Sequence, residues 1–409
     1  MTVFILGGGQ TDFARNYAKE GLELVDLVSD GLAATLENAA VEPSDIESIH
    51  VGNAFGELFA GQGHLGAMPA TVEPALWGVP AARHEAACAS ASIAVLAAMA
   101  EIEAGRYQCV LVLGVEQERN VPGDLAARHL GAAAWVGHEN QDAVFMWPTQ
   151  FSLLEEEYDR RYGVDHAHLA GIAQLNFANA RANPKAQTRS WSFSPESFLE
   201  DDIANPVVER RTRRTDCSQV TDGSAGIVLA SAEFAERHAV RQQGDLSRLA
   251  RIQGWGHRTT GLPLDRKLER SAGCRYVLPD VRSTITDAWS RAGIGGPDDL
   301  DGIETHDCFT MSEYAAIDHF GITAPGESWK AVESGALARD GRLPVNPSGG
   351  LIGGGHPVGA TGARMVLDAA KQVTGRAGEC QVDGARRFAT LNIGGSTTTS
   401  VSFIIGVED

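Results

Sequence analysis

Cys88 stands among small residues directly before a predicted helix. Residues 84–92 read HEAACASAS, and the helix is predicted from Ser90 to Glu103. The free amides and the positive dipole end of a helix N-terminus favour a thiolate, and small neighbours leave room for a substrate beside the sulfur. A lone cysteine is more often a buried structural residue. The nucleophile hypothesis therefore depends on which other groups reach Cys88.

His356 follows a glycine-rich loop and precedes another predicted helix, Ala360 to Val373. Residues 346–362 read NPSGGLIGGGHPVGATG. Such a loop could cradle phosphate, but it lacks the Lys-Ser/Thr ending of a P-loop and the spacing of the dinucleotide fingerprint. A histidine held between glycines and a proline is suited instead to act as a rigid general base. A cysteine and a histidine that are distant in sequence can meet in the fold as an activated pair.

His306, Asp307 and Cys308 follow a predicted strand, residues 302–305. They stand at the carboxyl end of that strand, where α/β folds gather ligands. The Cys308 thiol could serve as an acid and base, and His306 could donate a hydrogen bond to a developing oxyanion. Metal binding by the three residues is the alternative, which we disfavour because adjacent residues cannot readily all ligate one ion.

The last predicted α/β unit closes on a strand, residues 388–393, that runs into the sequence NIGGS at 392–396. The glycine amides of this segment could supply an oxyanion donor. The alternative is that Asn392 and Gly394 form a plain strand end with no part in the chemistry.

An internal repeat places these residues in two matching halves. In each half an amphipathic helix leads through a turn into a short strand, and a small-residue helix then leads into a buried strand. Short β-branched runs between helices indicate parallel strands in an α/β layer fold. The matched positions share one offset of 254 (303 − 49 and 309 − 55): Ile49 with Ile303, and Phe55 with Phe309. The corresponding predicted elements are the helices 25–38 and 279–292, the helices 90–103 and 360–373, and the strands 109–114 and 388–393.

Residues from about 118 to 245 interrupt the repeat and are richer in Glu, Asp, Arg, Asn and Trp. We interpret this stretch as an insertion that covers the site. It contains two predicted helices, 151–162 and 164–182, and a turn that enters a buried strand at 221–231. It also carries the one dense basic cluster of the chain, which either binds an anionic substrate or is a solvated loop: Arg210, Arg211, Arg213 and Arg214.

Composition argues against several classes of protein. The formal net charge of −19 disfavours a large nucleic-acid face. The six cysteines form no CxxC pair and are too sparse in 409 residues for a disulfide scaffold, so we expect reduced thiols and a cytoplasmic location. No apolar run has the length of a membrane-spanning helix. The N-terminal sequence MTVFILGGG reads as a strand and turn rather than a signal peptide.

Taken together, these motifs resemble the thiolase superfamily, and the resemblance covers nearly the whole chain. The CAS sequence at 88–90 looks like the family's Cys-x-Ser nucleophile motif, and GHP at 355–357 looks like its Gly-His-Pro base motif. The HDCF sequence at 306–309 is similar to the variant in the sterol-carrier-protein-2 type of thiolase. Ordinary thiolases carry a second cysteine, in a Cys-x-Gly motif, where this chain has Asn392; the sterol-carrier type also lacks it. Further similarity to that subfamily lies at 176–179, 183–187, 216–218 and 221–223.

The resemblance implies a fold and a domain organisation. The expected fold is the α/β thiolase fold, in which two duplicated βαβαβαββ halves form a five-layer α-β-α-β-α arrangement. The N-terminal half would span 1–118, the C-terminal half 246–409, and an inserted loop domain 119–245. The resemblance also implies a homodimer, with a tetramer as the alternative.

The implied activity is that of an acyl-CoA thiolase (acetyl-CoA C-acyltransferase), which cleaves a 3-ketoacyl-CoA with coenzyme A or runs the Claisen condensation in reverse. Cys88 would be the nucleophile, His356 the base, and Cys308 the acid and base. The resemblance implies no resident cofactor or metal, since coenzyme A is a substrate. The remaining site residues it suggests are His306 with His356 for the enolate oxygen, the amides of Cys88 and Gly394 for the tetrahedral oxyanion, Asn392 in the place of the usual cysteine, and Arg210, Arg211, Arg213 and Arg214 as coenzyme A contacts.

Two alternatives stay open. Some thiolase-like proteins catalyse aldol cleavage of steroid side-chain thioesters or transfer acyl groups to carbon on other acceptors, often with a small partner subunit of the OB-fold (DUF35) type. Lipid-carrier relatives suggest a non-catalytic binding subunit instead. The presence of Cys88, Cys308 and His356 in one chain favours the thiolase over both.

Overall fold

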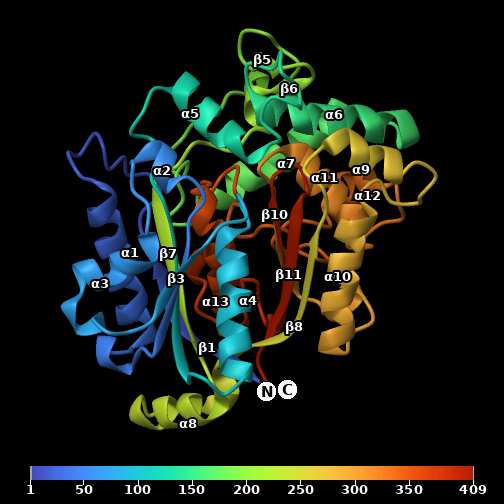
Figure 1. Cartoon of the computed structure of the whole chain (residues 1–409). Helices are drawn as coiled ribbons and strands as arrows, with labels where there is room; N and C mark the ends of the chain where they lie inside the picture. The colour runs from blue at the N-terminus through green and yellow to red at the C-terminus, as the bar shows by residue number, and fades with distance from the viewer. Residues whose placement is uncertain (1, 409) are drawn as a thin grey trace.

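Two half sheets join into one continuous mixed sheet in the computed structural model, which describes residues 2–408 (Figure 1). The strand order is β3-β2-β4-β7-β1-β8-β11-β10-β9. The first five strands belong to the N-terminal half and the other four to the C-terminal half. The halves meet where β1 pairs antiparallel with β8, from Val3 opposite Ile252 to Ile5 opposite Ala250.

The N-terminal half contains the predicted βαβαβαββ unit. Strands β2, β3 and β4 are mutually parallel, and β7 is antiparallel to both β4 and β1. Its elements are β1 (Val3–Gln10), α1 (Leu24–Ala39), β2 (Ser48–Gly52), α2 (Gly56–Phe59), α3 (Met68–Val72), β3 (Ala81–His84), α4 (Ser90–Glu103), β4 (Cys109–Glu116) and β7 (Gly223–Ala230).

The C-terminal half repeats this unit, with one strand reduced. Strand β2 begins at Ser48 and β9 at Gly302, so the predicted offset of 254 (302 − 48) is confirmed. The expected counterpart of β3 is only a single bridge between Ile303 and Val345. The elements are β8 (Ala250–Thr259), α9 (Leu264–Arg270), α10 (Pro279–Ala292), β9 (Gly302–Thr305), α11 (Thr310–His319), α12 (Ser328–Glu333), α13 (Thr361–Val373), β10 (Arg387–Gly394) and β11 (Thr399–Gly406).

Helices α4 and α13 lie between the two half sheets (Figure 1). Helix α4 is built mainly from small and apolar residues and has no continuous polar face, which is typical of a helix that is largely buried. The two helices share one hydrophobic cluster with strands of both halves. Val95 of α4 and Val366 of α13 belong to it, as do Val112 of β4 and Phe403 of β11. Helix α1 covers the outer face of the first half sheet, and α10 and α11 cover that of the second. The five-layer α-β-α-β-α arrangement is therefore confirmed.

The long connection between β4 and β7 caps the end of the molecule at which α4 begins (Figure 1). The matching connection in the other half is only the turn 395–398 between β10 and β11. Strand β7 falls inside 119–245, the range predicted as the inserted domain, but it is a central strand of the N-terminal half sheet. The connection contains α5 (Gly123–Leu130), α6 (Met146–Tyr162), α7 (His166–Ala180), β5 (Val207–Glu209) and β6 (Thr212–Arg213), and α8 (Ala232–Arg241) follows β7.

Within residues 2–408, no helix has the length and apolar character needed to cross a membrane.

Candidate active site

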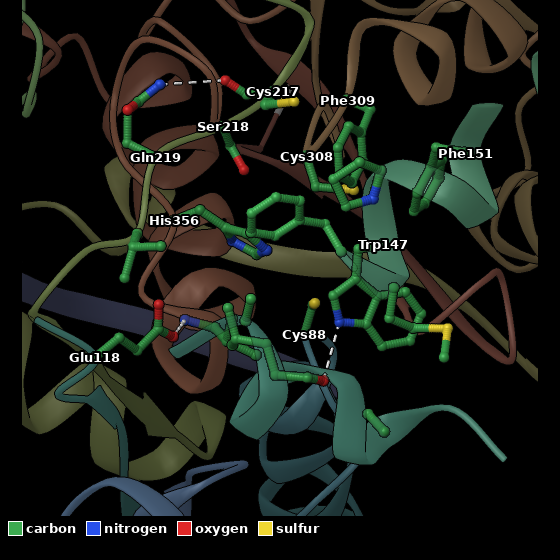
Figure 2. A pocket seen from close by; sticks show the side chains of 18 of the residues that line it. Cys88, Glu118, Trp147, Phe151, Cys217, Ser218, Gln219, Cys308, Phe309 and His356 are labelled. Carbon is green, nitrogen blue, oxygen red and sulfur yellow. Dashed lines mark hydrogen bonds between the residues drawn. The ribbon is translucent and has the colours of Figure 1, made fainter. Parts of the chain in front are cut away.

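Three of the residues singled out in the sequence come together above the central helices. The Cys88 sulfur and one ring nitrogen of each of His306 and His356 lie within 4.8 Å of one another. Cys88 precedes α4, His306 follows β9, and His356 lies just before the turn that begins α13. Cys88, His356 and Cys308 line one cavity of about 280 Å³, shown in Figure 2. A nucleophile and ionisable partners from three separate segments thus face one space.

His356 presents an unprotonated Nε2 to this space. Its Nδ1 lies 2.7 Å from Thr361 Oγ1, and the Thr361 hydroxyl donates to the Pro357 carbonyl at 3.0 Å. The Thr361 oxygen must therefore accept from Nδ1–H, which leaves the lone pair on Nε2. Burial, together with the charge of Arg364, lowers the pKa of His356 to about 3. The ring is neutral at physiological pH, so its Nε2 lone pair is free to accept a proton.

His306 has the opposite tautomer. Its Nδ1 lies 3.1 Å from the Asn392 side-chain nitrogen, and Asn392 Oδ1 accepts from Ser92 Oγ at 2.7 Å. The amide nitrogen therefore donates to Nδ1, and the ring proton must be on Nε2. Burial, with contributions from His356 and Arg364, lowers the pKa of His306 well below its usual value. Among the described residues Nε2 has no hydrogen-bond partner, so the neutral ring holds a free donor.

Burial raises the pKa of the Cys88 thiol to about 12, and the carboxyl of Glu118 adds to the rise. The nearby backbone amide of Gly395 opposes this effect. The thiolate character predicted from the helix N-terminus is thus outweighed, because α4 begins two residues later and burial disfavours the charged form of the thiol. Cys88 needs a base such as His356 to ionise.

Two consecutive glycines bring the end of β10 against the Cys88 loop. A side chain on Gly394 would lie 2.1 Å from the Ala86 carbonyl, so no other residue fits there without movement. Gly394 pairs with Thr399 in the β10–β11 ladder. The next residue, Gly395, lines the cavity with Cys88, and its backbone amide lowers the pKa of the Cys88 thiol.

Cys308 is a buried thiol that keeps its proton. Its sulfur lies 3.9 Å from Ser312 Oγ, and the Ser312 hydroxyl donates to the Phe309 carbonyl at 2.6 Å. Ser312 is therefore an acceptor for the S–H group. Burial, followed by the nearby Cys88, raises the pKa of Cys308 well above its usual value. The group can give up a proton only to a strongly basic atom in the cavity.

Buried carboxylates hold the glycine-rich loop of His356 at both ends. Asp307 accepts from the Leu351 and Ile352 amides at 2.6 and 3.1 Å, and a side chain on Gly350 would lie 2.3 Å from Asp307 Oδ2. On the far side of His356, Glu118 and Glu116 accept from the amides of Val358 and Gly359 at 2.9 and 3.0 Å. Neither glutamate was predicted from the sequence. The feature that could have indicated them is the presence of two acidic residues at the end of a buried strand.

Two family descriptions match this chain. Residues 3–192 match "Thiolase, N-terminal domain", and residues 275–407 match "Thiolase C-terminal domain-like". The chain belongs to the thiolase family. It is similar to the acetyl-CoA acetyltransferase of Methanothermobacter thermautotrophicus, with 30% identity over 98% of both chains. It is also similar to sterol carrier protein 2 of Gallus gallus, with 28% identity over 96% of this chain and 69% of that protein.

Solved structures share the fold of this thiolase-family chain at low identity. The "Ltp2-ChsH2(DUF35) aldolase" matches with a TM-score of 0.76 and 21% identity, over 100% of this chain and 98% of that chain. The human mitochondrial 3-ketoacyl-CoA thiolase in complex with CoA matches with a TM-score of 0.70 and 17% identity, over the same shares of the two chains. The thiolase fold predicted from the sequence is confirmed.

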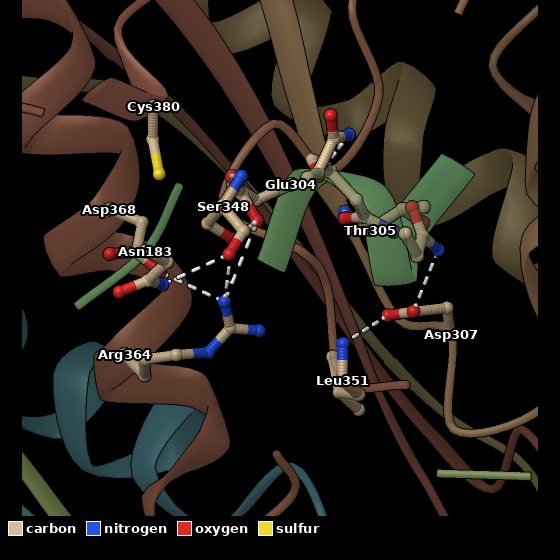
Figure 3. A network of polar contacts seen from close by, with 12 residues as sticks. Asn183, Glu304, Thr305, Asp307, Ser348, Leu351, Arg364, Asp368 and Cys380 are labelled. Atoms are coloured by element: carbon tan, nitrogen blue, oxygen red, sulfur yellow. Dashed lines mark hydrogen bonds and ion pairs between the residues drawn. The ribbon is translucent and has the colours of Figure 1, made fainter. Parts of the chain in front are cut away.

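Beneath the histidines of this thiolase-family site lies a buried ionic network that the sequence did not reveal (Figure 3). Arg364 Nη1 contacts Asp368 at 2.8 Å, Ser348 Oγ at 3.0 Å and Glu304 at 3.6 Å. Burial raises the pKa of Glu304 and Glu313 to about 8, because one guanidinium does not offset several clustered carboxyls. The Arg364 charge in turn helps to keep both histidines neutral.

The arginine cluster of the insertion is mostly neutralised. Arg210 pairs with Glu156 at 2.7 Å, and Arg211 with Asp159 at 2.8 Å. Arg213 pairs likewise with an aspartate on a neighbouring loop. Arg214 alone among the four lines the cavity, where its Nη2 donates to a backbone carbonyl.

Proposed function

We propose that this protein is an acyl-CoA thiolase (acetyl-CoA C-acyltransferase) that forms an acyl thioester on Cys88. The observation that carries the proposal is the convergence of Cys88, His306 and His356 within 4.8 Å, with the two rings in opposite tautomers. The relative with 30% identity is an acetyl-CoA acetyltransferase, which supports the same reaction class.

In the first half-reaction, Nε2 of His356 takes the proton of Cys88, and the thiolate attacks the 3-keto carbon of a 3-ketoacyl-CoA. The bond between C2 and C3 breaks, and the acyl group stays on the sulfur. The Cys308 thiol gives its proton to C2 of the departing acetyl-CoA enolate. Nε2–H of His306 and the newly protonated His356 stabilise the enolate oxygen while it carries charge.

In the second half-reaction, the thiol of coenzyme A attacks the acyl group on Cys88 and gives its proton to the Cys308 thiolate. The backbone amides of Cys88 and Gly394, with Gly395 beside them, hold the tetrahedral oxyanion. The protonated His356 then returns its proton to Cys88 as the bond to sulfur breaks, so every group regains its starting state. The reverse sequence is a Claisen condensation.

The cavity supports an apolar acyl group. The rings of Phe151 and Phe309 stack with centroids 4.7 Å apart, and Trp147 lies beside them. We propose Arg214 as the contact for coenzyme A from the arginine cluster, since Arg210 and Arg211 are already paired with carboxylates. Apart from these groups, the wall toward the insertion is largely aliphatic and aromatic, which favours hydrocarbon over polar chains.

The assembly and location are parts of the same proposal. Strand β3 lies at the end of the sheet, and its residues Ala81 and Ala82 are exposed. An exposed sheet edge is a ready template for a second chain, which supports a homodimer, with a tetramer as the alternative. Six cysteines without a disulfide among them support a reducing, cytoplasmic setting.

Acyl transfer or aldol cleavage with a small DUF35-type partner is the second candidate. Its support is the likeness of the fold to the "Ltp2-ChsH2(DUF35) aldolase". The set of Cys88, Cys308 and His356 in one cavity favours the thiolase, because aldol cleavage of a 3-hydroxyacyl thioester needs no cysteine nucleophile.

A coupled assay separates these functions. The purified chain is given coenzyme A with acetoacetyl-CoA, a long-chain 3-ketoacyl-CoA or a steroid 3-ketoacyl-CoA, and the acyl adduct on Cys88 is followed by mass spectrometry. We expect thiolysis of at least one substrate and an adduct on Cys88. A parallel reaction supplies a tertiary 3-hydroxyacyl-CoA without coenzyme A, and its cleavage to a ketone, without thiolysis of the other substrates or any adduct, would establish the aldolase instead.

A further inference from the structure

Lys267, on α9, is hydrogen-bonded to the turn between β10 and β11. Its Nζ donates to the Ser396 carbonyl at 2.6 Å, to Ser396 Oγ at 2.9 Å and to Thr398 Oγ1 at 2.8 Å. These bonds use all three N–H donors of an ammonium group. Lys267 is outside the reaction cavity, and every acceptor it contacts belongs to this one turn.

The same turn adjoins the cavity of the nucleophile Cys88. Gly395 lines the reaction cavity together with Cys88, and the β10–β11 ladder that places Gly394 ends at this turn. The turn needs external support, because Thr397 has a φ of +64°, a left-handed conformation that is unfavourable for a β-branched residue. The hydrogen bonds from Lys267 to Ser396 and Thr398, on either side of Thr397, supply that support.

We propose that Lys267 is a positioning residue for acyl transfer, whose three hydrogen bonds hold residues 395–398 so that the amide donors beside Cys88 meet the oxyanion. The inference rests on the proposed thiolase function and extends it to a residue that does not touch the substrate. A compact ammonium on a flexible stem suits three acceptors that do not lie in one plane, whereas a planar guanidinium fits them less well.

The electrostatic setting of Lys267 gives the proposal a pH signature. Burial lowers the pKa of Lys267 to about 7, and the one charge that opposes this effect comes from Glu139 in the insertion. The neighbouring charges Arg266 and Glu269 pair with each other on the exposed face of α9. When pH rises through 7, the ammonium becomes an amine with one donor fewer, and the turn loosens. An arginine at this position would stay charged.

The test measures acylation of Cys88 by acetyl-CoA in single turnovers between pH 6 and 9, with rapid quenching and intact-protein mass spectrometry. We expect Lys267→Met to acylate about 100-fold more slowly, the loss typical of a catalytic group displaced by about 1 Å, in a protein that remains folded at the assay temperature. Lys267→Arg should keep the rate within about tenfold and remove the decline above pH 7. The exposed Arg270→Met on the same helix is the matched control and should behave as wild type.

A folded Lys267→Met protein that acylates at the wild-type rate would overturn the inference. So would a Lys267→Arg protein with the same pH decline as wild type. If Lys267→Met does not fold, Thr398→Val removes one of the three acceptors and should slow acylation about tenfold; a wild-type rate in that variant also overturns the inference. Failure of the wild-type protein to acylate Cys88 would overturn the proposed function itself.

Discussion

The rings of His306 and His356 meet edge to face, with centroids 5.3 Å apart and planes at 83°, and they carry their protons on opposite nitrogens. Thr361 fixes the proton of His356 on Nδ1, and Asn392 fixes that of His306 on Nε2. One ring therefore offers a lone pair and the other an N–H to the same space beside Cys88. Because burial and Arg364 keep both rings neutral, the base and the donor coexist without competing charges.

Replacing Asn392 should reverse the tautomer of His306. In Asn392→Asp the carboxylate can only accept, so Nδ1 of His306 must carry the proton and Nε2 loses its donor. We expect kcat for thiolysis to fall about 100-fold, the typical loss of one oxyanion donor, while alkylation of Cys88 by iodoacetamide continues. Steady-state kinetics check this. A wild-type kcat would mean that residue 392 does not set the His306 proton.

Replacing each of the two cysteines should block a different step of the reaction. Cys88→Ala should form no acyl-enzyme with any acyl-CoA. Cys308→Ala should still take up an acyl group on Cys88 but lose carbon–carbon cleavage by about 1000-fold, since general acid catalysis contributes that order of rate. Intact-protein mass spectrometry and a thiolysis assay distinguish the steps. An undiminished adduct on the Cys88→Ala protein would refute the assignment of the nucleophile.

Removing the carboxyl of Glu118 should make Cys88 more reactive. The Glu118 charge raises the pKa of the Cys88 thiol, so Glu118→Gln should lower that pKa and increase the thiolate fraction at a given pH. Burial, followed by Glu116, raises the pKa of Glu118 itself well above its usual value, so the difference should appear as pH rises and Glu118 ionises. There we expect alkylation of Glu118→Gln to be several-fold faster, since each unit of pKa is worth about a factor of ten. The rate is measured against pH in both proteins. Equal rates at every pH would show that Glu118 is uncharged when Cys88 reacts.

Glu313 should make stability depend on pH. Burial, with Asp307 beside it, raises the pKa of Glu313 from 4.5 to about 8. The stability linked to a raised pKa is present below the unfolded value of 4.5 and is lost as pH rises through the folded value of about 8. Glu313→Gln mimics the protonated form, so its stability should not fall in this way as pH rises.

The expected size follows from the linkage. One unit of pKa corresponds to about 1.4 kcal/mol, so the free energy of unfolding of wild type should fall by at least about 1.4 kcal/mol more than that of Glu313→Gln between pH 5 and pH 8. Urea unfolding at a series of pH values measures it. Parallel curves for the two proteins would contradict the prediction.

Only one arginine of the insertion cluster should matter for coenzyme A. Arg214→Met should raise the KM for coenzyme A about tenfold with little change in kcat, because a charge-assisted contact to phosphate is worth roughly 1.5–3 kcal/mol. Arg210→Met, whose guanidinium is paired with Glu156, is the matched control and should stay within about twofold. Equal effects of both variants would point to diffuse charge attraction rather than a contact.

Much of the fold was predictable because the sequence patterns that indicate its helices and strands are local. The helix 90–103 was predicted with the bounds of α4, and the helix 279–292 with those of α10, since small-residue and amphipathic patterns extend over single elements. The weak counterpart of β3 at Val345 could not be foreseen, because a single bridge leaves no periodic pattern. The position of β7 within the sheet could not be predicted for another reason. Its partner strands β1 and β4 lie more than a hundred residues earlier in the sequence.

The sequence by itself determined which groups could react. Cys88 before a small-residue helix, His356 in a glycine loop, Cys308 after a strand, and the offset of 254 are properties of short segments and their order. Tertiary structure alone decided what state those groups are in. The tautomers of the histidines, the use of Asp307 as a loop anchor and the pairing of Arg210 with Glu156 all depend on partners that are distant in sequence. Protonation and hydrogen bonding are set by burial and by the nearest charge, and both exist only once the chain has folded.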